Sequence, residues 1–269
     1  MRAWTGIALA SLAWAGLVSA AAPAPEGKAE WVQVPGGRLR VRLFTGPRHA
    51  AAPTLVIVLH GDAPRTNPGY QYEFAAQAGK QDDVIAAAIL RPGYTDSLGD
   101  TSAGVRGMTT GDNYTRDRLA MIATAIRALK AEYEPRQTIL LGHSGGAALS
   151  ADLLALYPDL ADKALLASCP CDLEPWRQHM KTVAPTPLWD QPVDSVSPLS
   201  VAAKVPVRDK VVMMVGAADN VAPPGLTRAY AAALRRNGVQ VQLVELPGRD
   251  HEILLDPAVQ SALRALIAR

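Results

Sequence analysis

Residues 138–146 read Thr-Ile-Leu-Leu-Gly-His-Ser-Gly-Gly, an apolar run of four residues that leads into the pattern G-x-S-x-G around Ser144. The apolar run is typical of a buried strand, and residues 147–157 have the pattern of a helix. A serine on a sharp turn from strand to helix has a strained backbone that raises its hydroxyl above the sheet. The pattern is common by chance, but its place between strand and helix predicts that Ser144 is a nucleophile.

Short apolar runs alternate with amphipathic segments on both sides of this turn. Solid runs of Val, Ile and Leu are typical of strands that are buried on both faces of a parallel sheet. The predicted strands are 54–59, 84–90, 138–141, 163–167, 211–215 and 239–246, and the predicted helices are 118–133, 147–157, 225–236 and 257–268. The alternation predicts an α/β fold with a mostly parallel, doubly wound sheet and helices on both faces.

The first twenty residues differ from the rest of the chain. Arg2 is followed by an apolar run over residues 7–18 and by the small residues Val18-Ser19-Ala20, which is the pattern of a cleaved signal peptide. The run is shorter than the ~20 residues that span a bilayer, so no stable membrane anchor is expected after cleavage at Ala20. We predict a periplasmic or secreted protein with a signal peptide (1–20), a flexible mature N-terminus (21–30) and a single α/β domain (31–269).

The composition excludes several classes of protein. The 269 residues are 49% hydrophobic, and 27 Lys and Arg face 25 Asp and Glu, for a formal net charge of +2. The chain has no block of like charges, so no nucleic-acid partner is expected, and its apolar content is too high for a disordered chain.

Cys169 and Cys171 are the two cysteines of the chain, and they flank Pro170. We expect a tight turn after a strand, in which the two cysteines either form a small disulfide ring, as an oxidising compartment allows, or remain as two thiols. A zinc site lacks further ligands nearby. Residues 170–206, which are rich in proline, form a predicted insertion near the site.

A nucleophilic serine needs a base, and His251 follows the last predicted strand, so it lies at the same edge of the sheet as Ser144. The acid that orients this histidine should come from the loop after the preceding strand, which holds Asp219. Asp194, Asp209 and Asp250 are the competing acids, but they lie in the insertion, before a strand and next to His251, respectively. The predicted catalytic residues are Ser144, His251 and Asp219.

Acyl transfer also needs two N–H donors for the oxyanion. The first is the amide that follows the nucleophile, at Gly145. The second should come from the loop after the first buried strand, where we expect the Asp62 amide, with Ala63 as the second choice.

The motifs Leu59-His-Gly-Asp62, Gly142-His-Ser-Gly-Gly146, Gly216-Ala-Ala-Asp219 and Asp250-His251 together resemble the α/β-hydrolase superfamily, in its branch of serine esterases and serine aminopeptidase-like enzymes. The resemblance covers residue 54 to the C-terminus. It implies acyl transfer to water through an acyl-enzyme on Ser144, with no metal or organic cofactor.

Three functions remain open from the sequence. The first is an exported esterase that takes a small-molecule ester, the second is a peptidase or amidase, and the third is a hydrolase-fold protein that binds without turnover. Aromatic residues of loops are expected to wall the substrate pocket: Tyr70, Tyr114, Trp176 and Trp189. The sequence does not decide the oligomeric state.

Overall fold

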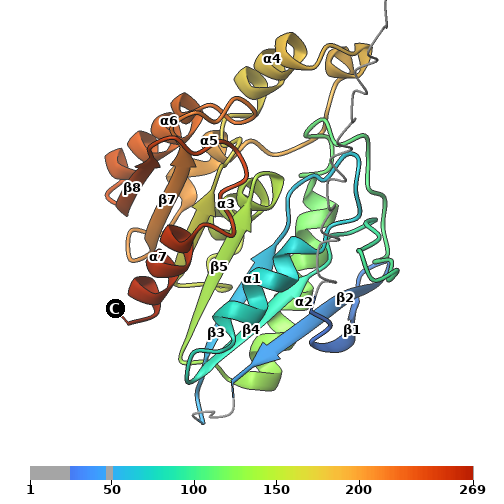
Figure 1. The fold of residues 1–269 in the computed structure, drawn as a ribbon, viewed down its shortest axis with the longest axis vertical. Helices are drawn as coiled ribbons and strands as arrows, with labels where there is room; N and C mark the ends of the chain where they lie inside the picture. The colour runs from blue at the N-terminus through green and yellow to red at the C-terminus, as the bar shows by residue number, and fades with distance from the viewer. Residues whose placement is uncertain (1–24, 47–50, 269) are drawn as a thin grey trace, which may run out of the picture.

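The computed structural model describes residues 25–46 and 51–268, which form an open sheet of eight strands with helices on both sides (Figure 1). The predicted signal peptide and its cleavage point after Ala20 lie outside the described residues. The strand order is β1-β2-β4-β3-β5-β6-β7-β8. The strands are β1 Lys28–Val34, β2 Gly37–Thr45, β3 Thr54–Leu59, β4 Val84–Ile89, β5 Gln137–His143, β6 Lys163–Ala167, β7 Lys210–Gly216 and β8 Gln240–Leu246.

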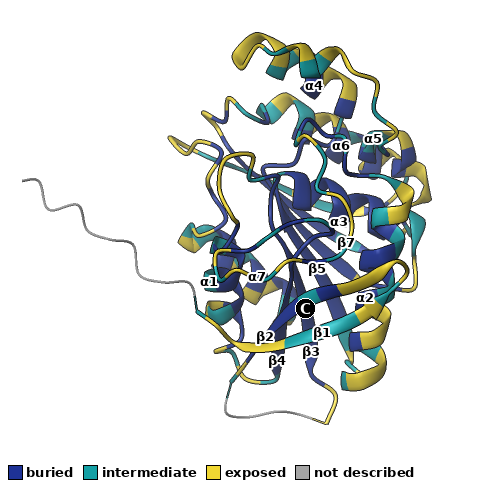
Figure 2. Ribbon diagram, turned by 90° about the vertical axis from the view of Figure 1, so that its right-hand side faces the viewer, coloured by how far each residue is buried: buried dark blue, intermediate teal, exposed yellow. Residues whose placement is uncertain are grey.

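Most of the sheet is parallel, as predicted. All neighbours from β4 to β8 pair in parallel, whereas β2 pairs antiparallel with both β1 and β4. Strands β3, β4 and β6 are buried along their whole length, because helices cover both faces of the sheet. Figure 2 shows this buried centre in dark blue.

The strand prediction is wrong about the environment of β8. This strand lies at the end of the sheet, and its residues are exposed or only partly buried. Its sequence, Gln-Val-Gln-Leu-Val-Glu-Leu, begins with the polar and apolar alternation of a half-solvated strand. An edge strand has a neighbour on one side only, which leaves its polar side chains in water.

The prediction of a flexible segment over residues 21–30 is also wrong at its C-terminal end. Strand β1 begins at Lys28, which pairs with Leu43 of β2. Backbone hydrogen bonds to β2 order these residues, although their side chains are mostly exposed and give little hydrophobic signal.

The helices divide into two layers. Helices α1 and α7 pack on one face of the sheet, and α2, α3 and α6 pack on the other (Figure 1). The helices are α1 Tyr70–Ala78, α2 Arg116–Tyr133, α3 Gly145–Leu156, α4 Leu173–Val183, α5 Pro198–Val201, α6 Pro224–Arg236 and α7 Pro257–Ala268, with short 3-10 helices η1 Pro187–Asp190 and η2 Ala202–Lys204.

The proline-rich insertion contains helix α4, which the sequence pattern did not predict. The helix lies beyond the carboxyl ends of the parallel strands (Figures 1 and 2) and buries three of its side chains, Leu173, Trp176 and Arg177. Its apolar residues Leu173, Trp176 and Met180 recur at helical spacing, but the prolines in and around the segment are typical of a loop, which is how the sequence was interpreted. Pro185 follows soon after its last turn, consistent with a helix that stops there.

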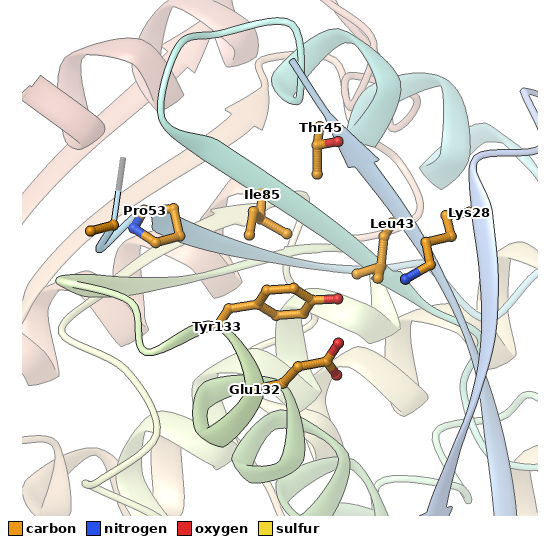
Figure 3. A pocket seen from close by; sticks show the side chains of 8 residues that line it. Lys28, Leu43, Thr45, Pro53, Ile85, Glu132 and Tyr133 are labelled. Atoms are coloured by element: carbon orange, nitrogen blue, oxygen red, sulfur yellow. The ribbon is translucent and has the colours of Figure 1, made fainter. Parts of the chain in front are cut away.

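A cavity of about 380 Å³ lies near the amino ends of β3 and β4 (Figure 3). Glu132 and Tyr133 at the end of α2 face residues of the strands across it, including Leu43 and Ile85. It is therefore at the opposite end of the strands from Ser144.

Within residues 25–46 and 51–268, no helix is both long and apolar enough to cross a membrane.

Candidate active site

Ser144 occupies a strained turn between β5 and α3, as the sequence pattern predicts. Its backbone has φ 53° and ψ −124°, a left-handed conformation that residues with a side chain rarely adopt. Its N–H donates to the carbonyl of Ala167 at 2.9 Å, which ties the turn to β6. A Cβ at Gly142 would lie 2.2 Å from the Gly146 carbonyl oxygen, so only glycine permits this close approach of strand and helix.

The fold brings Ser144, His251 and Asp219 together. The distance from His251 Nε2 to Ser144 Oγ is 2.9 Å, and His251 Nδ1 lies 3.0 and 2.9 Å from the two Asp219 carboxylate oxygens. Because a carboxylate only accepts, Nδ1 carries the proton, and the lone pair of Nε2 faces the serine hydroxyl. This is the arrangement in which an imidazole accepts the proton of a serine.

Asp219 is buried in the loop after β7, where it is well supplied with donors. Besides His251, the amides of Val221 and Ala222 donate to its Oδ1 at 2.9 and 2.8 Å. Burial alone would raise the pKa of Asp219, but the hydrogen bonds from the His251 ring and the two amides lower it below its ordinary value. The carboxylate therefore stays charged beside the ring.

The two predicted oxyanion donors lie beside the serine. A Cβ at Gly145 would lie 2.3 Å from Asp62 Oδ1, and one at Gly61 would lie 3.0 Å from Ser144 Cβ, so loop and turn are in contact. The first N–H groups that bond back to Ser144 O are those of Ala147 and Ala148. The Gly145 amide comes before these two along the chain. It lies at the N-terminus of α3, the end of a helix that attracts anions.

The Asp62 carboxylate faces the interior. Arg91 Nη2 donates to its Oδ1 at 2.9 Å, and the Tyr114 hydroxyl donates to its Oδ2 at 2.6 Å. The Tyr94 hydroxyl donates to the Asp62 carbonyl at 2.9 Å. These three side chains, all nearly or fully buried, fix the loop from behind.

Tyr114 does not wall the pocket, contrary to the prediction from sequence. It is fully buried in the core, and its hydroxyl lies behind the site, bonded to Asp62 and packed against Gly145, where a Cβ would lie 2.6 Å from it. Burial and the Asp62 carboxylate raise the pKa of Tyr114 well above its ordinary value, so the phenol stays protonated and donates.

Arg91 is a residue of the site that the sequence analysis missed. Its guanidinium also donates to the His60 carbonyl at 3.1 Å and to Asn113 Oδ1 at 2.7 Å. A signal was present, because a charged residue directly follows the solid apolar run 84–90 at the carboxyl edge of the sheet. His60 contributes to the same network: its Nδ1 bonds the Gly61 carbonyl at 2.7 Å, and its Nε2 accepts from the Arg91 amide at 3.1 Å.

Tyr70, Trp176 and Trp189 line a cavity of about 830 Å³ that contains Ser144 and His251. The two indole rings meet edge to face with their centres 5.6 Å apart. Backbone carbonyls of Val221 and Ala184 satisfy the Trp176 and Trp189 N–H groups, at 2.9 and 2.8 Å. The cavity wall also includes the apolar side chains of Met108, Met180 and Leu188.

Buried Arg177 fastens this wall. Its guanidinium donates to the carbonyls of Trp189 and Gln191 at 2.8 and 2.7 Å, and to the carbonyl of Thr110. One side chain of α4 thus joins three segments around the cavity, which holds the tryptophan rings in place.

Cys169 and Cys171 form a disulfide on the turn after β6. Both are fully buried, and the Cys171 carbonyl accepts from the Leu199 amide at 2.9 Å. Of the two alternatives that the sequence leaves open, the structure contains the bridge. Among the described residues, no group of three or more His, Cys, Asp or Glu could hold a metal ion.

The fold is similar to those of solved hydrolases. The acylaminoacyl peptidase of Pyrococcus horikoshii superposes with a TM-score of 0.69 at 13% identity over 90% of this chain, and a puromycin-hydrolyzing peptidase of Mycobacterium tuberculosis with 0.68 at 18% over 90%. Est1E from Butyrivibrio proteoclasticus superposes with 0.67 at 15% over 90% of this chain. The protein has the α/β-hydrolase fold.

Residues 105–267, more than half of the chain, match the prolyl oligopeptidase family. The chain belongs to this family of serine hydrolases. It spans 41% and 39% of the two peptidase chains and 99% of Est1E. No sequence among curated proteins matches it.

Proposed function

We propose that this serine hydrolase cleaves carboxylic esters through an acyl-enzyme on Ser144. The observation that carries the proposal is the unbroken set of hydrogen bonds from Ser144 Oγ through the His251 ring to Asp219. The strained turn, the free end of α3 and the fixed loop at Asp62 surround the same hydroxyl.

In the first half-reaction, Ser144 Oγ attacks the carbonyl carbon while His251 Nε2 takes the serine proton. Negative charge develops on the carbonyl oxygen, next to the Gly145 and Asp62 amides. Collapse of the tetrahedral intermediate breaks the bond to the alcohol oxygen, which receives the proton from His251. In the second half-reaction, His251 deprotonates water, whose oxygen attacks the acyl carbon. The bond to Ser144 Oγ then breaks, the carboxylic acid leaves, and His251 returns the proton to Oγ.

The cavity supports a bulky apolar group as one part of the substrate. Trp176, Trp189 and Met180 present apolar surface, and their backbone anchors keep it in place. The Asp62 carboxylate is occupied by Arg91 and Tyr114, so it does not bind a substrate amine as an aminopeptidase would require. This occupancy removes Asp62 as an anchor for a free amino terminus.

Amide or peptide hydrolysis is the second candidate, and the family supports it. Members of the prolyl oligopeptidase family and two of the similar structures are named as peptidases. The same triad chemistry cleaves an amide when the leaving nitrogen receives the His251 proton.

We also propose that the protein is exported. The leader pattern of residues 1–20 supports export, and a buried Cys169–Cys171 disulfide suits an oxidising compartment. Amino-terminal sequencing of the protein from periplasm and medium tests this, with Ala21 as the expected first residue.

The test of the function compares p-nitrophenyl acyl esters of increasing size with aminoacyl p-nitroanilides. We expect turnover of esters above amides, and a fall of about 10⁴-fold or more in Ser144→Ala. Ser150→Ala is the matched control, since Ser150 lies on α3, the helix that follows Ser144, and among the described residues its hydroxyl bonds only the Gly146 carbonyl.

A fluorophosphonate probe gives an independent readout, because it modifies activated serines. Modification mapped to Ser144 and absent in His251→Ala supports the triad. Higher turnover of anilides than esters would favour the peptidase, and a folded protein with neither turnover nor labelling would favour a binding role.

A further inference from the structure

Tyr70 lies between the oxyanion loop and the nucleophile turn. Its hydroxyl oxygen is 2.6 Å from the Gly61 backbone nitrogen and 3.0 Å from Nδ1 of His143. On its far side, His143 Nε2 lies 3.0 Å from the carbonyl oxygen of His251. Three hydrogen bonds therefore connect the loop that holds one oxyanion donor to the backbone of the predicted base.

Each donor in this chain is determined by its partners. A carbonyl only accepts, so His143 Nε2 carries the proton that bonds His251 O. Burial, followed by the neighbouring His251, lowers the pKa of His143 to about 4, so the ring is neutral and its Nδ1 is an acceptor. The Tyr70 hydroxyl must then donate to Nδ1, and its oxygen accepts the Gly61 N–H.

We propose that Tyr70 and His143 are positioning residues, which form a relay that holds the oxyanion loop and the His251 backbone in one fixed geometry. The relay rests on the proposed function of the site, because it serves Ser144 chemistry. Tyr70 and His143 are not assigned proton transfer: both nitrogens of His143 and the hydroxyl hydrogen of Tyr70 are already committed within the relay.

The relay joins four separate segments of the fold. Gly61 follows β3, Tyr70 begins α1, His143 ends β5 and His251 follows β8. The Ser168 hydroxyl and the Ile253 amide donate to the same His251 carbonyl at 2.9 and 3.0 Å, so with His143 this oxygen has three donors. The Tyr70 ring also meets the His143 ring edge to face, with centres 5.5 Å apart, which fixes the hydroxyl beside Nδ1.

The experiment compares Tyr70→Phe with Tyr72→Phe. Both remove one hydroxyl from helix α1, but the Tyr72 hydroxyl donates to Asp96, away from the site. We expect Tyr70→Phe to lower kcat by about 10- to 100-fold, as displacements of reacting groups by less than 1 Å do, with KM changed by less than about twofold. Tyr72→Phe should keep kcat within about twofold of wild type.

Two substitutions at the histidine test the second half of the relay. His143→Leu removes both bonds, whereas His143→Gln supplies an amide N–H for the His251 carbonyl and an amide oxygen for Tyr70. We expect Leu to lower kcat by about tenfold or more and Gln to restore most of the loss. In the double variant Tyr70→Phe/His143→Leu, the loss should be smaller than the product of the single losses.

A Tyr70→Phe variant with wild-type kcat would overturn the relay, and so would equal losses in Tyr70→Phe and Tyr72→Phe. If His143→Leu does not fold, the comparison of Tyr70→Phe with Tyr72→Phe still tests the relay. Ser144→Ala, run in the same assay, separates the two proposals: turnover that survives it contradicts the proposed function. Turnover that needs Ser144 but is indifferent to Tyr70→Phe contradicts the relay alone.

Discussion

The nucleophile turn (residues 142–146) and the oxyanion loop (residues 60–63) lie against each other, yet they are held by different means. Backbone contacts hold the turn at Ser144: its N–H bonds Ala167 O, and glycines let strand, turn and helix touch, while the His143 side chain adds the bonds of the relay. Side chains hold the loop, chiefly Arg91 and Tyr114 on the Asp62 carboxylate and Tyr94 on its carbonyl.

Substitutions at the triad and substitutions behind the oxyanion loop should therefore have different consequences. A change at the triad removes a group that reacts, so activity falls while the fold stays intact. A change behind the loop removes a buried partner, so stability and alignment fall together. Substitutions in the two regions should therefore move kcat and the free energy of unfolding in different proportions.

The largest effect is expected from Asp219→Asn. An amide in place of the carboxylate no longer selects the tautomer with a proton on Nδ1, so kcat should fall by about 10³- to 10⁴-fold with little change in KM. Asp250→Asn is the control, because Asp250 is adjacent to His251, but within the described part of the chain its carboxylate bonds only the Glu252 amide. Steady-state kinetics of both variants on one ester measure the effect. A loss in Asp250→Asn without a loss in Asp219→Asn would assign the acid to Asp250, and equal losses would contradict a specific role for Asp219.

Arg91→Met tests the loop side of the comparison. The variant leaves the Asp62 carboxylate buried without its cation, which should lower the free energy of unfolding by about 3 kcal/mol and kcat by about 10- to 100-fold. Urea unfolding and kinetics on the same preparation measure both. Arg127→Met, which breaks an exposed pair with Asp159, should cost less than about 1 kcal/mol and no activity. A stable Arg91→Met with low kcat would mean that Arg91 acts on substrate and not through the loop.

A smaller effect is expected from Trp189→Ala, which changes the cavity and neither of the two regions. Loss of the indole should raise KM for esters with a bulky apolar acyl group by about tenfold and leave an acetyl ester nearly unchanged. Trp31→Ala, in β1 at the far edge of the sheet, is the control. A parallel rise in KM for the acetyl ester would contradict an acyl-binding role for this wall.

The smallest effect is expected in helix α3, behind the nucleophile turn, at Asp152. Both its carboxylate oxygens are buried and without a partner among the described residues, and burial raises the pKa of this carboxyl well above its ordinary value. The folded state therefore favours the protonated acid, and wild type loses stability as pH rises above the pKa of the unfolded chain, near 4.

Asp152→Asn removes this ionisation. The variant should be more stable than wild type at pH 8, by on the order of 1–2 kcal/mol, and the gain should vanish toward pH 4, with kcat unchanged. Urea unfolding at several pH values measures the gain, and Asp159→Asn is the exposed control. A gain that does not depend on pH would contradict the assigned protonation.

The parts of the fold that local pattern determines were predicted well. Strands β3 and β6 and helix α7 have the predicted bounds, since solid apolar runs and an amphipathic stripe report on burial within a few residues. The prediction was wrong where neighbouring segments or local breakers decide: residues 28–30 of β1 pair with β2 and are not flexible, edge strand β8 is not buried, and α4 forms within the proline-rich insertion.

The sequence by itself determined the order of strand, serine turn, acid loop and histidine loop, because each of these signals lies within one short segment. Parallel strands carry their loops to one edge, and this brought Ser144, Asp219 and His251 together as predicted. Only the tertiary structure decided that Tyr114 lies behind Asp62, that Arg91 holds the loop, and that Tyr70 joins Gly61 to His143. These contacts join residues that are 9 to 73 positions apart, and side-chain packing, not local pattern, selects such partners.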